Sequence, residues 1–152
     1  MKKIEILCVG KIKENYFKDA IAEYQKRLSR FCNFSIVEVV EFGDSTLAKE
    51  KEGAAILQKM LDGSFLILLD IQGEMITSEG LAKEIDLAFV KGNDKVRFVV
   101  GGSHGISEIV KEKADKAISF GKITYPHQLF RVVLCEQIYR ALCIQNGTPY
   151  HK

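Results

Sequence analysis

The chain has 152 residues, enough for one folded domain, because a chain of this length buries about 70% of its unfolded surface. With 47% hydrophobic and 28% charged residues, its composition argues against wholesale disorder and against an integral membrane protein. Glu5 interrupts the apolar stretch that a signal peptide would need. We therefore expect a cytoplasmic protein with a single domain over residues 1–152 and no membrane partner.

The charge is unevenly distributed, although the net charge is only +2. Residues 1–30 hold eight Lys and Arg against four Asp and Glu, and residues 116–152 hold five against one. Residues 31–115 hold nine against fifteen. A polyanionic partner would therefore meet the two ends of the chain. The alternative is that the lysines of an amphipathic first helix are merely solvated.

The four cysteines show no C-x-x-C spacing. In a cytoplasmic chain this pattern indicates small buried hydrophobic residues. A zinc site shared with the three histidines would need a ligand spacing that the chain lacks. We therefore expect no metal.

The first part of the chain alternates between strand and helix patterns. Residues 4–9 form a predicted strand that ends at a glycine. Residues 15–30 carry apolar side chains at helical spacing, with Lys, Arg and Glu on the other face. The β-branched residues of 34–40 predict a second strand.

The middle of the chain repeats the alternation. Asp44 or Ser45 can cap a helix that continues to Leu61. Residues 65–70 are apolar on both faces, as in a central strand of a parallel sheet. Another helix is expected over 77–90.

The last part holds two more strands. Residues 96–100 form a predicted strand, and a short helix follows to Ala114. Residues 117–120 form the fifth strand, and the loop 121–128 leads into a last helix over 129–144. Both prolines lie in the last 27 residues, so glycines alone punctuate the rest.

This order of elements predicts the fold class. Alternating strands and helices are typical of an α/β domain whose mostly parallel sheet has helices on both faces. Ligands of such sheets bind beyond the carboxyl ends of the strands. The loops 71–74, 101–105 and 121–128 are therefore the expected site.

The glycine-rich loop from Gly101 to Gly105 is the most informative local feature. Adjacent glycines after a buried strand let the backbone approach a ligand closely. If Ser103 caps the following helix, free N–H groups would favour anions or polar atoms. The spacing is neither a Rossmann fingerprint nor a Walker A loop, and a plain tight turn is the alternative.

The loop 120–127 and the helix after it are unusually apolar. The run from Leu129 to Leu134 has Arg131 as its only polar residue. A helix this apolar in a small domain suggests a subunit interface, and the alternative is a core helix of the monomer. The final residues, Pro149 to Lys152, are either a frayed end or a docked functional element.

These segments together resemble a known family. They are the opening Ile-Leu-Cys-Val-Gly-Lys, Leu69-Asp-Ile-Gln-Gly73, the 101–105 loop, residues 119–131 and the ending Tyr-His-Lys. The chain is similar, over essentially its whole length, to the SPOUT-class large-subunit ribosomal RNA methyltransferase H family. Members methylate N3 of a pseudouridine with S-adenosylmethionine.

The resemblance implies a C-terminal trefoil knot, a homodimer, and large-subunit (23S) ribosomal RNA within the assembled ribosome as the partner. By the same likeness, the backbone holds the methyl donor at three places. These are Leu69, Gly101 and the stretch Phe120, Gly121, Lys122, Ile123, Thr124 and Tyr125. Gly121 stands where the family often carries a serine, so a hydroxyl contact there is lost.

Methyl transfer to N3 requires loss of the N3 proton, which a nearby cation or base would favour. The candidates for this task are His151 and Arg131, with Tyr150 positioning the base. Two other classes stay open. One is a non-enzymatic RNA- or ribosome-binding protein of the same fold, and the other is a nucleotide-binding regulator that uses the 101–105 loop as an anion nest.

Overall fold

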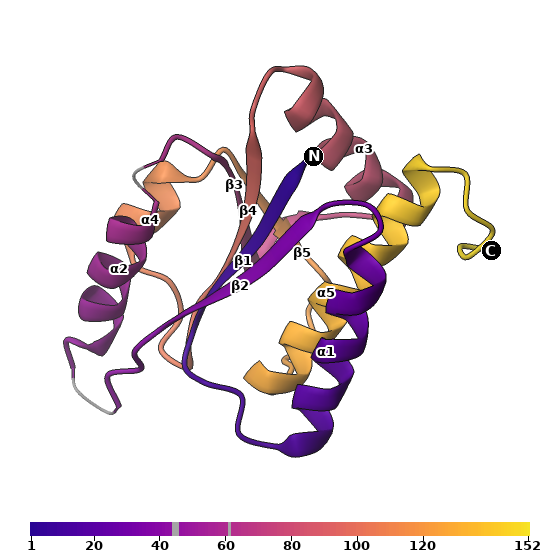
Figure 1. Cartoon of the computed structure of the whole chain (residues 1–152). Helices are drawn as coiled ribbons and strands as arrows, with labels where there is room; N and C mark the ends of the chain where they lie inside the picture. The colour runs from indigo at the N-terminus through magenta and orange to yellow at the C-terminus, as the bar shows by residue number, and fades with distance from the viewer. Residues whose placement is uncertain (44–45, 61) are drawn as a thin grey trace.

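A computed structural model describes residues 1–43, 46–60 and 62–152 (Figure 1). In this part of the chain a single five-stranded sheet has the strand order β2-β1-β4-β3-β5, with every pairing parallel. The α/β prediction is thereby confirmed. The strands are β1 (Lys3–Val9), β2 (Asn33–Val39), β3 (Phe65–Met75), β4 (Lys95–Val100) and β5 (Lys116–Ser119).

Helices cover both faces of the sheet. Figure 1 shows α1, α3 and α5 side by side on one face, with α2 and α4 together on the other. No helix in the described ranges is long and apolar enough to cross a bilayer. The helices are α1 (Asn15–Leu28), α2 (Ala48–Lys59), α3 (Ser78–Val90), α4 (Glu108–Lys113) and α5 (His127–Gln145).

The core has two layers because successive side chains of a strand point to opposite faces. Ile6 of β1, which pairs with Phe98 of β4, packs in the layer under α1, α3 and α5. Leu7 packs in the layer under α2 and α4. All four cysteines are buried, as predicted. Burial raises the pKa of Cys8 to about 12 and that of Cys32 to about 11, which suits inert core residues.

The strand β3 is longer than the sequence indicates. Its register against β5 shifts between Leu69 and Glu74, after which pairing resumes to Met75. A Cβ on Gly73 would lie 2.8 Å from backbone atoms of Ala117 and Ile118, so glycine permits this close passage. The prediction of a loop over 71–74 is therefore wrong, because these residues belong to an irregular strand.

The predicted starts of three helices can be compared with the structure. Thr77 caps α3 as expected, since its Oγ1 accepts a hydrogen bond from Gly80 N at 2.9 Å. The cap of α4 is Ser107 and not Ser103, so that prediction is wrong. The helix α2 begins at Ala48, whereas the predicted caps Asp44 and Ser45 and the predicted end Leu61 lie outside the described residues.

Candidate functional site

A cavity of about 460 Å³ lies at the carboxyl ends of β3, β4 and β5, where the parallel sheet predicts a ligand site. Pockets of roughly 300–1,000 Å³ hold small molecules and cofactors. The walls combine the later part of β3, two loops of the chain and the first turn of α5. They include Leu69, Asp70, Ile71, Gln72, Gly101, Gly102, Ser103, Gly105, Phe120, Gly121, Ile123, Thr124, Tyr125, His127 and Phe130.

The glycine loop forms one wall and folds tightly on itself. Gly105 N donates to Gly102 O at 3.1 Å, which closes the turn. A Cβ on Gly101 would lie 2.6 Å from Ile106 Cγ1 and 2.9 Å from Gly105 O. Glycine at 101 is thus required by the packing of the loop itself, so a larger residue there would disturb the wall as well as any ligand.

The opposite wall is the segment that joins β5 to α5. Ser119 Oγ accepts a hydrogen bond from Gly121 N at 3.1 Å and donates to Gly121 O at 3.0 Å. Gly121 has a φ of +110°, a conformation that favours glycine. Phe130 packs 5.5 Å from the rings of both Phe120 and Tyr125, which stiffens the wall.

The structure brings together most of the predicted donor-binding residues. Lys122 is the exception, because its side chain is exposed and the residue does not line the cavity. Asp70, which the sequence did not single out, lies in the wall with its carboxylate 3.9 Å from Lys111 Nζ. The predicted donor-binding residues that do line the cavity are Leu69, Gly101, Phe120, Gly121, Ile123, Thr124 and Tyr125.

The C-terminal tail is docked on α5 and α3. Tyr150 Oη donates to Glu136 Oε1 at 2.8 Å, and the Arg140 guanidinium lies 4.7 Å from the centre of the Tyr150 ring. His151 contacts Arg140 Nη1 at 3.2 Å and Glu79 Oε1 at 2.6 Å. Burial, together with the hydrogen bond to Glu136, raises the pKa of Tyr150 to about 12.

These contacts fix the histidine tautomer. A guanidinium can only donate hydrogen bonds, so Nδ1 of His151 accepts from Arg140. In the neutral ring Nε2 then carries the proton and donates it to Glu79. The bond from His151 holds the pKa of the Glu79 carboxyl below its usual range. Arg140 was missed by the sequence analysis, although its spacing of four residues from Glu136 on one helix face could have indicated it.

Arg131 occupies a different place. Its side chain is buried, with Nη1 2.8 Å from Glu38 Oε2 and Nη2 donating to the carbonyls of Val9 and Gly10 at 3.2 Å. It does not line the cavity. The geometry gives Arg131 a structural task between α5 and the ends of β1 and β2. Its catalytic role stays a prediction from the sequence.

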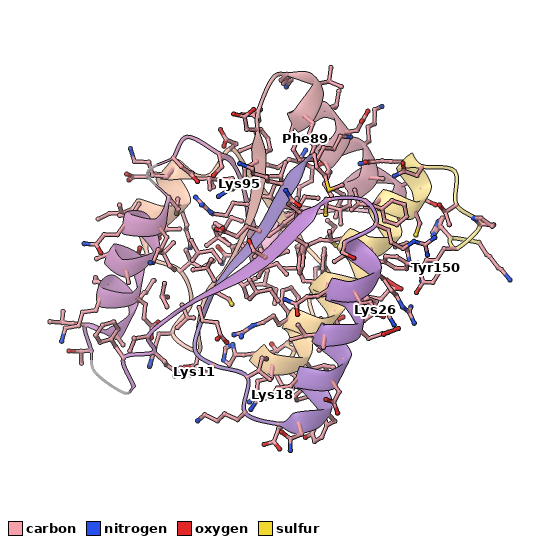
Figure 2. The ribbon with its side chains drawn as sticks, in the orientation of Figure 1. Lys11, Lys18, Lys26, Phe89, Lys95 and Tyr150 are labelled. Atoms are coloured by element: carbon pink, nitrogen blue, oxygen red, sulfur yellow. The ribbon has the colours of Figure 1, made fainter. Side chains whose placement is uncertain are left out.

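The tail and the cavity are separate within one chain. Neither Tyr150 nor His151 lines the cavity, whose last contact on α5 is Phe130. Tyr150 is docked at Glu136, which is about 9 Å further along the helix axis. Figure 2 places Tyr150 beside the later turns of α5.

A second hollow of about 240 Å³ lies on the other side of the 119–121 segment. It shares Ser119, Phe120, Gly121 and Tyr125 with the first cavity, and its other lining residues include Met75, Val133 and Gln137. Met75 is 66% exposed and Leu129 is 37% exposed, so apolar surface continues around this hollow. Most other apolar residues of α5 pack in the core of the monomer. This agrees with the alternative, stated from the sequence, that α5 is a core helix and not mainly a subunit interface.

Comparison with known proteins identifies relatives over the whole chain. A family model described as "Predicted SPOUT methyltransferase" matches residues 1–151. A protein from Lactobacillus acidophilus named ribosomal RNA large subunit methyltransferase H is 51% identical, over 98% of this chain and 99% of the relative. A protein of the same name from Clostridium botulinum is 49% identical with the same coverage.

Solved structures share the fold at low identity. The tRNA (m1G37) methyltransferase from Aquifex aeolicus superposes with a TM-score of 0.52 and 13% identity, over 91% of this chain and 70% of that chain. A structure titled for the 2-OH methylation of C/U34 on tRNA gives a TM-score of 0.50 and 13% identity, over 96% of this chain and 98% of that chain.

Proposed function

Because the chain belongs to the SPOUT methyltransferase family, we propose that it transfers a methyl group from S-adenosylmethionine to N3 of a pseudouridine in large-subunit ribosomal RNA. The observation that carries the proposal is the cavity at the carboxyl edge of the sheet, in a chain 51% identical to a protein named for this RNA. An assembled ribosome is the proposed substrate, which places the enzyme in the cytoplasm.

The residues of the cavity suit this donor. The aromatic rings of Phe120 and Tyr125 offer an apolar wall for an adenine, and exposed backbone groups of the two loops offer hydrogen bonds. The space at Gly121 is open, since nothing lies within 4 Å of where its Cβ would stand. Leu69, Gly101 and the 120–125 segment would hold the donor, which supplies an electrophilic methyl group on a sulfonium. No cluster of potential metal ligands occurs among the described residues.

The protein's task is mainly alignment, because a sulfonium methyl needs little activation. The rigid loops fix the donor side. On the acceptor side, N3 of pseudouridine must lose a proton, and a cation next to it stabilises the anion that forms. We assign the cation to Arg140, which is held by Glu136. We assign acceptance of the N3 proton to Nδ1 of the neutral His151 ring, whose other nitrogen is held by Glu79. Tyr150 packs against Arg140 and positions the base.

A homodimer would bring the tail and the cavity together, although they are separate within one chain. In a two-fold symmetric pair whose α5 helices run antiparallel, the end of one helix lies beside the start of the other. The tail of one subunit would then close the cavity of its partner. The exposed Met75 and Leu129 and the second hollow beside them support an interface on this side of α5.

The test combines two measurements. Calorimetry should detect S-adenosylmethionine binding without added metal, and mass mapping of ribosomal RNA from cells with and without the gene should show one methylated pseudouridine that depends on it. Donor binding with no change in the RNA would reassign the substrate. Absence of donor binding would favour a non-enzymatic ribosome-binding protein.

A further inference from the structure

We propose that the corner between β1 and α1, made by Lys11, Lys13, Tyr16 and Lys18, is a second RNA-contacting surface that binds an unpaired nucleotide near the target. This surface, the Tyr16 corner, lies outside the cavity and the tail. The inference rests on the proposed function, because it assumes that RNA approaches the cavity.

Tyr16 has the properties of a stacking platform. Its side chain is 65% exposed, although it is a large aromatic residue. Among the described residues its ring contacts one other aromatic ring, that of Phe17, with 4.6 Å between the ring centres and 60° between the ring planes. The half-buried Phe17 thus supports Tyr16 and leaves most of its surface to solvent. Unpaired bases stack on exposed aromatic rings of this kind.

Lys11, Lys13 and Lys18 lie on the same short stretch of chain as Tyr16. All are exposed, and none forms an ion pair with any residue in the ranges 1–43, 46–60 and 62–152. Figure 2 shows Lys11 and Lys18 at the same end of the molecule. Lys95, Lys111 and Lys116, in contrast, are all paired with carboxylates. Unpaired lysines beside an exposed aromatic ring suit the phosphates and bases of single-stranded RNA.

The corner is fixed next to the cavity. Gln128 Oε1 accepts hydrogen bonds from the backbone N–H groups of Lys13 at 2.9 Å and Glu14 at 3.3 Å. Gln128 directly follows His127, which lines the cavity. The starts of α1 and α5 therefore lie together at the end of the molecule where the strands end (Figure 1). RNA that delivers a base to the cavity passes this corner.

The charge of the corner favours RNA over a second copy of this chain. In a two-fold interface built on this corner, both copies would bring the same lysine-bearing surface together, and like charges repel. A polyanion instead releases counterions as each lysine meets a phosphate. Glu14 and Asp19 lie in the same stretch and reduce this attraction, so we expect Tyr16 to provide much of the contact.

The experiment compares Tyr16→Ala, Tyr16→Phe and the triple variant K11Q/K13Q/K18Q with the parent. A matched control is K59Q/K83Q/K91Q, which removes the same charge from exposed lysines elsewhere. Steady-state methyl transfer to ribosomal particles gives KM and kcat, and fluorescence anisotropy with a labelled single-stranded oligouridylate gives Kd. Calorimetry with S-adenosylmethionine and sedimentation check the donor site and the assembly.

We expect Tyr16→Ala to raise KM and the oligouridylate Kd roughly tenfold, with kcat, donor affinity and assembly unchanged. Tyr16→Phe should stay near the parent because it keeps the ring. The triple lysine variant should weaken binding and reduce the salt slope of log Kd by about 2, since each single-strand phosphate contact contributes about 0.7. The control triple should leave that slope close to the parent's.

The outcomes separate this inference from the proposed function. If the parent transfers no methyl group to RNA but its oligouridylate binding depends on Tyr16, the proposed function fails and the Tyr16 corner stands. If the parent is active and neither KM nor Kd responds to Tyr16→Ala, the inference is overturned. A change of assembly in Tyr16→Ala would also overturn it, since the corner would then belong to a subunit interface.

Discussion

Arg131 Nη1 lies 2.8 Å from Glu38 Oε2, and this ion pair joins the start of α5 to the end of β2. The same carboxylate oxygen accepts a hydrogen bond from Ile12 N at 3.2 Å. Arg131 also reaches the carbonyls that end β1. One side chain therefore holds three segments of the chain in place behind the cavity wall.

Substitution of Arg131 should act mainly by lowering the free energy of unfolding, and less by slowing methyl transfer in the folded protein. Arg131→Ala removes a buried cation and leaves two carbonyls without a donor, so we expect a loss of about 2–3 kcal/mol in the free energy of unfolding. This is below the range for fully buried pairs because the Glu38 side chain is 36% exposed. Urea unfolding measures the loss, with the exposed Arg30→Ala as control. A variant as stable as the parent but inactive would return Arg131 to the catalytic set.

Removal of the tail should separate donor binding from methyl transfer. Deletion of residues 150–152 touches neither the sheet nor the loops of the cavity, so folding and donor affinity should stay near those of the parent. Methyl transfer should fall by roughly 10²-fold, as expected when a positioned acid–base group is lost. His151→Ala tests the imidazole itself. Full activity of the truncated protein would mean that the tail serves no catalytic purpose.

The proposed site shared by two subunits predicts complementation between two inactive variants. A tail-deleted subunit and a Thr124→Trp subunit, whose cavity is filled, should each be inactive alone. Heterodimers of the two contain one intact cavity facing one intact tail, so activity should return on co-expression. Sedimentation should show a species near twice 17.1 kDa for each protein. Continued inactivity of verified heterodimers would argue for a site within one chain.

Gly73 should be sensitive to the smallest substitution. In Gly73→Ala the new Cβ would lie 2.8 Å from backbone atoms of β5, which cannot rotate away. We expect a loss of about 1–3 kcal/mol from overpacking, together with weaker donor binding because β5 leads into the cavity wall. Thermal unfolding and calorimetry measure the two effects, with the exposed Lys83→Ala, which lies outside the cavity, as control. Unchanged stability would show that β3 and β5 can separate at no cost.

The docked tail should weaken in alkaline solution. The pKa of Tyr150 is raised to about 12 from an ordinary value of 10, so its contribution to docking is fully present below pH 10. It is lost as the pH rises through about 12, because the phenolate repels Glu136. Phenolate absorbance is titrated in the parent and in Tyr150→Phe. The difference between the two curves gives the titration of Tyr150 alone. Glu136→Gln should lower the midpoint, whereas a midpoint near 10 in the parent would mean that the tail is undocked.

The sequence predicted the architecture because its local patterns were consistent. The apolar runs of β3 and β4 and the polar faces of the helices repeat at the periods of strand and helix. The extension of β3 to Met75 was hidden, since Gly73 has the appearance of a turn residue. Glycine serves there to pass close to another strand, which no local pattern reveals. The trefoil knot stays a prediction from the resemblance.

Some residues of the candidate site were predicted from the sequence, and others were not. Contiguous residues 120–125 were expected to act together, but Lys122 is exposed and does not line the cavity that its neighbours line. The ion pair of Arg131 was not foreseen, because its partner Glu38 is 93 residues away in the chain. Arg140 was not singled out, because its contact with His151 depends on the returning tail, which reaches the helix only after the chain has turned at Gly147.

The strand order also affects the biosynthesis of the chain. One edge of β1 pairs with β2 as soon as residue 39 is available, but the other edge must wait for β4, which begins at Lys95. At translation rates of about 5–20 residues per second, this interval lasts roughly 3–11 s. During this time a nascent chain would present an unpaired, strongly apolar strand edge, which is a substrate for chaperones and a risk for aggregation.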